Sequence, residues 1–243
     1  MKKILYGFFL LFIISHRNAY ADPTEQTNIN EAHAKLSGME IDYWLYTPET
    51  VSGDMPLIVY LHGGTSKGND LDLLIKREGF PQYVIQGKLN IPAYVIMPQA
   101  PEEIRSWNEI GNQIVELAAI TVDQYPIDSG KISLTGHSMG GIGTWEIGFA
   151  HKDFFSRIAP LSGTISKRLQ SAISELTIPV WSIIGSDPSD QNAFSSNTSI
   201  FPQIEKNNPN ARLTIMEGAK HWEVVKAYLQ YDIINWLIGS DTQ

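Results

Sequence analysis

Short apolar runs alternate with amphipathic stretches along most of the chain. Six runs rich in apolar and β-branched residues have the length and composition of buried strands. These runs are residues 57–61, 93–97, 131–135, 157–161, 179–185 and 212–216. Apolar positions at helical spacing follow or separate them, in residues 108–125, after Ser138, in 166–175, within 193–207, and in 225–237 at the C-terminal end. The pattern therefore predicts strands and helices in regular alternation.

Such alternation is typical of an α/β fold, with a mostly parallel central sheet and helices on both faces. Ahead of it, residues 32–36 and 41–46 read as two extended segments, which predicts an antiparallel hairpin at one edge of the sheet. The link between residues 162 and 179 has room for about one helix, so we expect no large cap domain and an open site. No repeat or break in composition marks a second domain, and we expect a single domain over residues 22–243.

The N-terminal 21 residues have the pattern of a secretory signal peptide. Lys2 and Lys3 form a positive region, residues 4–14 are apolar, and residues 19–21 read Ala-Tyr-Ala, an A-x-A cleavage site. Eleven apolar positions are too few to span a bilayer, which needs about 20. We therefore expect cleavage before Asp22, export to the periplasm or the extracellular space, and no stable membrane anchor afterwards.

Composition narrows the function further. The formal charge of the chain is −8; residues 1–21 carry three basic and no acidic side chains, so their removal leaves −8 − 3 = −11. An acidic protein of this kind is a poor partner for nucleic acid or for anionic membranes. The absence of cysteine excludes disulfides, thiolate metal ligands and a cysteine nucleophile. No H-E-x-x-H motif or clustered histidine spacing appears, so we expect neither a metal nor a cofactor.

Residues 136–140 read G-H-S-M-G and carry the most specific motif in the chain. They match G-x-S-x-G, with a predicted strand before and a predicted helix after, which is the context of a nucleophile elbow. Glycines at positions 140, 141, 143 and 148 crowd that helix. Each costs roughly 1 kcal/mol of helix propensity, which suits a helix that packs closely on its sheet. Ser138 is therefore the candidate nucleophile, although a glycine-rich loop can match the motif by chance.

A serine nucleophile needs a base, and His221 is the candidate. It lies in a short loop after the last predicted strand, at the sheet edge where α/β proteins bind ligands. The acid should lie between Ser138 and His221 at another strand end. Asp187 follows the strand 179–185 by two residues and is our choice, with Asp190 as the competitor. An N-terminal helix cap is the alternative role of either residue, and Asp190 suits that role better.

Negative charge on a tetrahedral intermediate needs hydrogen-bond donors that are already in place. The backbone N–H of Met139, at the start of the helix, is the first candidate. The second is the N–H of Gly64, in the glycine turn that follows the strand 57–61. His137, Trp107 and Trp222 lie beside these motifs in the sequence and are candidates for contact with substrate, although a core or rim position is as plausible for a tryptophan.

Four segments together resemble the α/β-hydrolase fold, and most closely the secreted esterases of the phospholipase/carboxylesterase and feruloyl- or polyhydroxybutyrate-depolymerase-like groups. The segments are LIVYLHGG from residue 57, YVIMPQAP from residue 94 with Trp107 after it, YPIDSGKISLTGHSMGGIGTW from residue 125, and GAKHW from residue 218. The resemblance covers nearly all of residues 41–237 and implies the same roles for Ser138, Asp187, His221, Gly64 and Met139. One departure lies in the acid loop, where relatives usually carry a Val-Pro that is missing after Asp187.

The sequence therefore predicts a secreted serine carboxylesterase that acts through an acyl-enzyme on small or polymer-borne esters. Esters on plant cell-wall carbohydrate are one substrate class that the resemblance implies. A serine peptidase on the same fold and a non-catalytic binding domain are the alternatives. The sequence does not encode the acyl group, the alcohol group or the oligomeric state.

Overall fold

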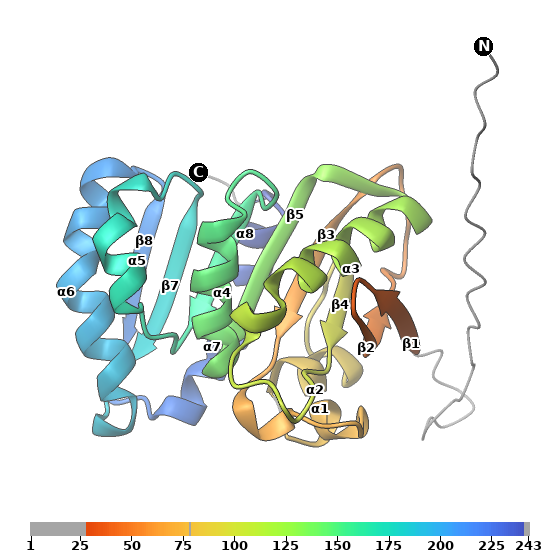
Figure 1. The fold of residues 1–243 in the computed structure, drawn as a ribbon, viewed down its shortest axis with the longest axis horizontal. Coiled ribbons are helices and arrows are strands. Elements are labelled where there is room, and N and C mark those ends of the chain that lie inside the picture. The colour runs from red at the N-terminus through yellow and green to blue at the C-terminus, as the bar shows by residue number, and fades with distance from the viewer. Residues whose placement is uncertain (1–27, 78, 241–243) are drawn as a thin grey trace, which may run out of the picture.

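The computed structural model describes residues 28–77 and 79–240, which form an eight-stranded sheet between two layers of helices (Figure 1). The strand order is β1-β2-β4-β3-β5-β6-β7-β8. The predicted signal peptide, residues 1–21, lies outside the described residues. Among the helices of residues 28–77 and 79–240, none combines the length and the apolar character that a membrane span requires.

The strands include all the predicted runs. They are β1 (Ile29–Leu36), β2 (Met39–Tyr46), β3 (Met55–Leu61), β4 (Tyr94–Pro98), β5 (Ile127–His137), β6 (Arg157–Leu161), β7 (Val180–Gly185) and β8 (Ala211–Met216). β1 pairs with β2 and β2 with β4 in antiparallel orientation, whereas every other pair is parallel. The predicted α/β class, with a mostly parallel sheet and an antiparallel hairpin at one edge, is confirmed.

The α-helices are α1 (Asp72–Arg77), α2 (Gly79–Ile85), α3 (Gly111–Gln124), α4 (Met139–Ala150), α5 (Lys167–Ala172), α6 (Gln191–Asn207), α7 (Ala227–Gln230) and α8 (Ile233–Leu237). Short 3-10 helices are η1 (Gly64–Ser66), η2 (Trp107–Ile110), η3 (Ile173–Glu175), η4 (Pro188–Asp190) and η5 (His221–Lys226). Only α5 and η3 lie between β6 and β7, so no cap domain is inserted there, as predicted.

The two faces of the sheet carry separate apolar cores. In β3, Leu57, Val59 and Leu61 pack in the core under α3, α4 and α6, while Ile58 and Tyr60 pack in the core on the opposite face. Successive side chains of a strand point to opposite faces, so a strand buried on both faces is apolar at nearly every position. This requirement explains why the predicted strands were continuous apolar runs and not alternating ones.

The C-terminal segment differs from the single amphipathic helix that its sequence predicts. It divides into η5, α7 and α8, with Tyr231 extended between the last two. The break lets the ring of Tyr228 pack on that of Phe80, with 4.6 Å between the ring centroids. The ring of Trp236 packs edge to face on Trp181, with 5.8 Å between the centroids. Tertiary packing at two separate places, on α2 and on β7, therefore overrides the helical period.

Helix α4 approaches the sheet more closely than a side chain would allow. A Cβ on Gly140 would lie 1.8 Å from the carbonyl oxygen of Leu61, and one on Gly141 would lie 2.2 Å from that of Leu161. These carbonyls end β3 and β6, on either side of β5. The glycines thus let the first turn of α4 rest directly on the strand ends.

We predict that Gly140→Ala lowers the free energy of unfolding by about 3 kcal/mol, because a methyl group there must push the start of α4 away from the end of β3. Gly111→Ala is the control: its Cβ would meet only the side chain of Ile147, at 3.2 Å, and a helical glycine gains up to about 1 kcal/mol from alanine. Urea denaturation followed by circular dichroism measures both. Equal losses for the two variants would contradict the close packing described here.

Candidate active site

Ser138 lies between the end of β5 and the start of α4 with φ 60° and ψ −117°. Its N–H donates to the carbonyl of Leu161 at 3.0 Å, and its own carbonyl accepts from the N–H of Ile142 at 2.9 Å, which fixes the turn. Only Ser138 and Ser162 combine a side chain beyond glycine with positive φ among the residues that the structure describes. Such strain costs on the order of 1–3 kcal/mol and concentrates at functional sites.

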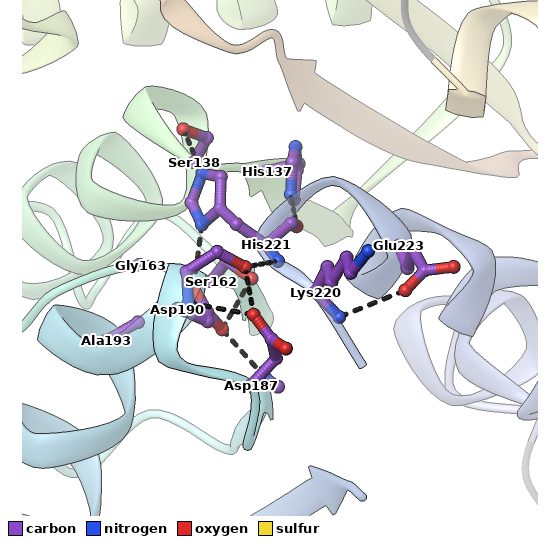
Figure 2. A network of polar contacts seen from close by, with 12 residues as sticks. His137, Ser138, Ser162, Gly163, Asp187, Asp190, Ala193, Lys220, His221 and Glu223 are labelled. Carbon is purple, nitrogen blue, oxygen red and sulfur yellow. Dashed lines mark hydrogen bonds and ion pairs between the residues drawn. The ribbon is translucent and has the colours of Figure 1, made fainter. Parts of the chain in front are cut away.

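His221 approaches Ser138 from the loop after β8. Its Nε2 lies 2.8 Å from the Oγ of Ser138, although the two residues are 83 positions apart in the sequence. Figure 2 shows the imidazole between the serine hydroxyl on one side and the carboxylate of Asp190 on the other. The predicted pairing of the hydroxyl with this imidazole is present in the structure.

Asp190 is the carboxylate that contacts the imidazole. Its Oδ1 lies 2.6 Å from the Nδ1 of His221. Its Oδ2 accepts from the N–H of Gly185 at 2.7 Å and from the Oγ of Ser162 at 3.0 Å. The side chain is 1% exposed, and these three hydrogen bonds to protein groups fix the orientation of the carboxylate. A carboxylate on Nδ1 keeps the proton there and leaves Nε2 able to accept one from Ser138.

The choice of Asp187 as the partner of His221 is therefore wrong, and the two aspartates exchange their expected roles. Asp187 caps η4: its Oδ1 accepts from the N–H of Ser189 at 2.9 Å and from the Ser189 hydroxyl at 2.7 Å. These hydrogen bonds lower the pKa of the Asp187 carboxyl. The turn of η4 carries the chain on to Asp190, which faces the imidazole. The number of residues after the strand end does not predict which aspartate the turn of η4 directs toward His221.

Gly64 and Met139, the expected oxyanion donors, lie side by side. A Cβ on Gly64 would lie 3.8 Å from the Sδ of Met139. Gly64 begins η1 and Met139 begins α4, so the backbone N–H of each belongs to a first helical turn, where such groups lack a partner within the helix. The arrangement can place two donors near the Ser138 hydroxyl.

His62 supports the turn that contains Gly64. Its Nδ1 donates to the carbonyl of Gly63 at 2.6 Å, and its Nε2 accepts from the N–H of Ala100 at 2.9 Å. Burial lowers the pKa of this imidazole to about 4, so the ring is neutral at pH 7. It connects the ends of β3 and β4.

Trp107 does not form the wall of a substrate site. It is fully buried, its Nε1 donates to the carbonyl of His62 at 2.9 Å, and its ring lies 4.9 Å from the His62 ring. The prediction of substrate contact is wrong for this residue, because its side chain is buried and supports the turn at His62 from inside the protein.

His137 is also buried, and its Nε2 lies 2.8 Å from the backbone carbonyl of His221. Burial is the main cause that lowers its pKa, to about 4. The neutral ring donates from Nε2 to this carbonyl. His137 therefore contacts the backbone of the candidate base, whereas the sequence predicted contact with substrate.

Trp222 differs from the other two candidates for substrate contact. It follows His221 directly, is 61% exposed, and carries the Lys220 ammonium 5.3 Å from its ring centroid. An exposed tryptophan directly after His221 in the chain is available to bind a ring or an acyl chain.

Sequence reasoning overlooked Ser162 and Ser189, which bind the two aspartates. Ser162 was open to discovery, because it directly follows the strand 157–161 and so lies at the same sheet edge as Ser138. Ser189 lies in a turn and gave no signal. Among the described residues, no group of three or more histidine, aspartate or glutamate side chains is arranged to hold a metal ion.

The strained serine after β5, the imidazole after β8, the carboxylate after β7 and the mostly parallel sheet define the α/β-hydrolase class. A protein-family model described as "Putative esterase" matches residues 35–220, and the chain belongs to this esterase family. A comparison with curated protein sequences gives no significant match.

Solved esterases share the fold. A thermostable esterase is 24% identical with a TM-score of 0.68; the match covers 87% of this chain and 63% of that one, so this chain spans less than two thirds of its length. The feruloyl esterase module from Clostridium thermocellum, complexed with sinapinate, is 14% identical with a TM-score of 0.70, and 96% of each chain is covered. An S-formylglutathione hydrolase from Staphylococcus aureus is 15% identical with a TM-score of 0.65, covering 88% of this chain and 98% of that one.

The buried imidazoles predict an acid-sensitive fold. The pKa of His137 falls from 6.5 to about 4 in the folded protein, so the unfolded chain binds a proton between these values that the folded protein excludes. Stability is therefore lost as the pH falls from 6.5 to 4. His137→Gln keeps an amide donor but has no group that titrates at this position. Between pH 7.5 and pH 4.5 we expect its free energy of unfolding to fall by roughly 2–3 kcal/mol less than that of the unsubstituted protein.

Urea denaturation at the two pH values measures this difference. His33→Gln serves as the control, because the His33 side chain is 42% exposed. Parallel loss of stability in His137→Gln and in the unsubstituted protein would contradict the burial of a neutral ring at position 137.

Proposed function

We propose that the protein is an exported serine carboxylesterase that hydrolyses carboxylic esters through an acyl-enzyme. The observation that carries the proposal is the continuous line of contacts from the Ser138 hydroxyl through His221 to Asp190, at 2.8 and 2.6 Å. Membership of the esterase family supports the reaction class. The A-x-A signal at residues 19–21 supports export.

In the proposed acylation step, the Oγ of Ser138 attacks the ester carbonyl carbon while Nε2 of His221 takes the hydroxyl proton. The carboxylate of Asp190 holds the Nδ1 proton and stabilises the imidazolium that forms. The tetrahedral intermediate then collapses, the ester C–O bond breaks, and the imidazolium returns its proton to the leaving alkoxide. The alcohol departs and the acyl group stays on Ser138.

Deacylation repeats these steps with water. Nε2 of His221 takes a proton from the water that attacks the acyl carbonyl, and the second intermediate collapses to release the carboxylic acid and restore the serine hydroxyl. In both intermediates the negative oxygen accepts from the N–H groups of Met139 and Gly64. Each such donor is worth about 3–4 kcal/mol where it has been tested.

The architecture supports accessible esters, small or polymer-borne, as substrates. The linker between β6 and β7 holds only α5 and η3, and the His221 side chain is 32% exposed. Trp222, which is exposed and follows His221 directly, could offer a ring face to an aromatic acyl group or a sugar. The structural similarity to a feruloyl esterase module complexed with sinapinate is consistent with an aromatic acyl group.

We predict that the protein hydrolyses p-nitrophenyl acyl esters faster than the matched p-nitroanilides, and that Ser138→Ala abolishes both activities without loss of fold. Circular dichroism and the midpoint of thermal unfolding test the fold of the variant. Faster turnover of the anilide would favour a peptidase. Ester hydrolysis by Ser138→Ala at the same rate as by the unsubstituted protein would show that Ser138 is not the nucleophile.

We further predict that Asp190→Asn lowers kcat by about 10⁴-fold, because an amide at this position stabilises the wrong imidazole tautomer. Asp187→Asn, in the same loop, should cost no more than about tenfold, since its amide oxygen can still accept from Ser189. Steady-state kinetics on a single short-chain ester compares the two. A larger loss for Asp187→Asn than for Asp190→Asn would reverse the assignment of the acid.

A further inference from the structure

The peptide groups of His221 are held by side chains on both sides. Its N–H donates to the Oγ of Ser189 at 3.0 Å, and its carbonyl accepts from the Nε2 of His137 at 2.8 Å. Neither contact involves the imidazole of His221. The main chain of the candidate base is therefore fixed independently of its ring.

The Ser189 hydroxyl is held in one direction by Asp187. It donates its single proton to the Oδ1 of Asp187 at 2.7 Å, and the Ser189 N–H donates to the same oxygen at 2.9 Å. A hydroxyl that has committed its proton offers only lone pairs to its other neighbours. Asp187 thus makes the Ser189 hydroxyl an acceptor for the N–H of His221.

The second support comes from the strand that carries the nucleophile. His137 is the last residue of β5 and directly precedes Ser138, so its hydrogen bond ties the His221 loop to that strand. Ser189 lies in η4, one residue before Asp190. Each support of the His221 backbone therefore neighbours one of the two groups that the imidazole must join.

We propose that Asp187, Ser189 and His137 are positioning residues that fix the His221 backbone so that its imidazole reaches Ser138 and Asp190 together. The inference rests on the proposed function. His221 begins a 3-10 helix in a connecting loop, and its side chain is 32% exposed, so its own burial does not fix it. A displacement of about 1 Å in a catalytic group can cost on the order of 100-fold in rate. None of the three residues needs to touch the substrate.

Ser189→Ala tests the proposal against a closely matched control. Ser186 makes the same kind of contacts three residues earlier: its Oγ donates to Glu217 at 3.0 Å and accepts from the N–H of Gly218 at 2.8 Å. Ser186→Ala therefore removes an equivalent hydroxyl between the same two loops without touching His221. A purely structural role predicts equal effects of the two substitutions.

We expect Ser189→Ala to lower kcat on a short p-nitrophenyl ester by about 10- to 100-fold, with KM within about twofold, while Ser186→Ala stays within about twofold in kcat. The rate of covalent labelling by a fluorophosphonate should fall by the same factor as kcat. Ser189→Thr keeps a hydroxyl and should restore most of the rate. Thermal midpoints of the two alanine variants should agree within about 3 °C.

Asp187→Ala provides the second variant, since it leaves the Ser189 hydroxyl in place but frees its proton. It should lower kcat by about tenfold with KM unchanged. Equal kcat for folded Ser189→Ala and Ser186→Ala in an active enzyme overturns the inference and leaves the proposed function intact. If the unsubstituted protein neither hydrolyses esters nor reacts with the fluorophosphonate, the proposed function fails and the positioning role falls with it.

Discussion

The contact of the first turn of α4 with the ends of β3 and β6 is the constraint on which the rest of the site depends. Gly140 rests against the carbonyl of Leu61 and Gly141 against that of Leu161, at separations that exclude a side chain. Because α4 begins so close to the sheet, the chain has to turn within one residue, and Ser138 takes φ 60° to make that turn. The hydroxyl is thereby presented at the sheet edge, half-buried and within reach of the following loops.

The remaining groups reach this edge because parallel strands end there together. The loops after β6, β7 and β8 supply Ser162, Asp190 and His221, and the hydrogen bonds between them join segments that are far apart in the sequence. Burial sorts the polar groups by task. Asp190, His62 and His137 are almost completely enclosed and have protein partners, whereas the His221 side chain stays partly exposed. A rigid, enclosed rear and an accessible front are what a hydrolytic site requires.

Sequence patterns predicted most of this arrangement, because strand runs, the G-x-S-x-G elbow and the order serine, acid, histidine are local or ordinal features. What they missed depends on three-dimensional packing. The single turn of η4 decides that Asp190 and not Asp187 faces His221, and spacing from a strand end does not encode that rotation. Trp107 reads as a neighbour of the site, yet its burial against His62 follows from the packing of α4 and η2. The division of the C-terminal segment depends in the same way on the contacts of Tyr228 with Phe80 of α2 and of Trp236 with Trp181 of β7.

The central claim is that the acyl group passes through Ser138. Acid quenching during turnover of a p-nitrophenyl ester, followed by mass spectrometry of the proteolytic peptides, tests that claim most directly. The account predicts one added acyl mass, on the peptide that contains Ser138. This acylated peptide accumulates with esters whose deacylation is slower than their acylation. An acyl group on a different residue would contradict it, and so would steady hydrolysis in which no peptide carries an acyl group at any quench time.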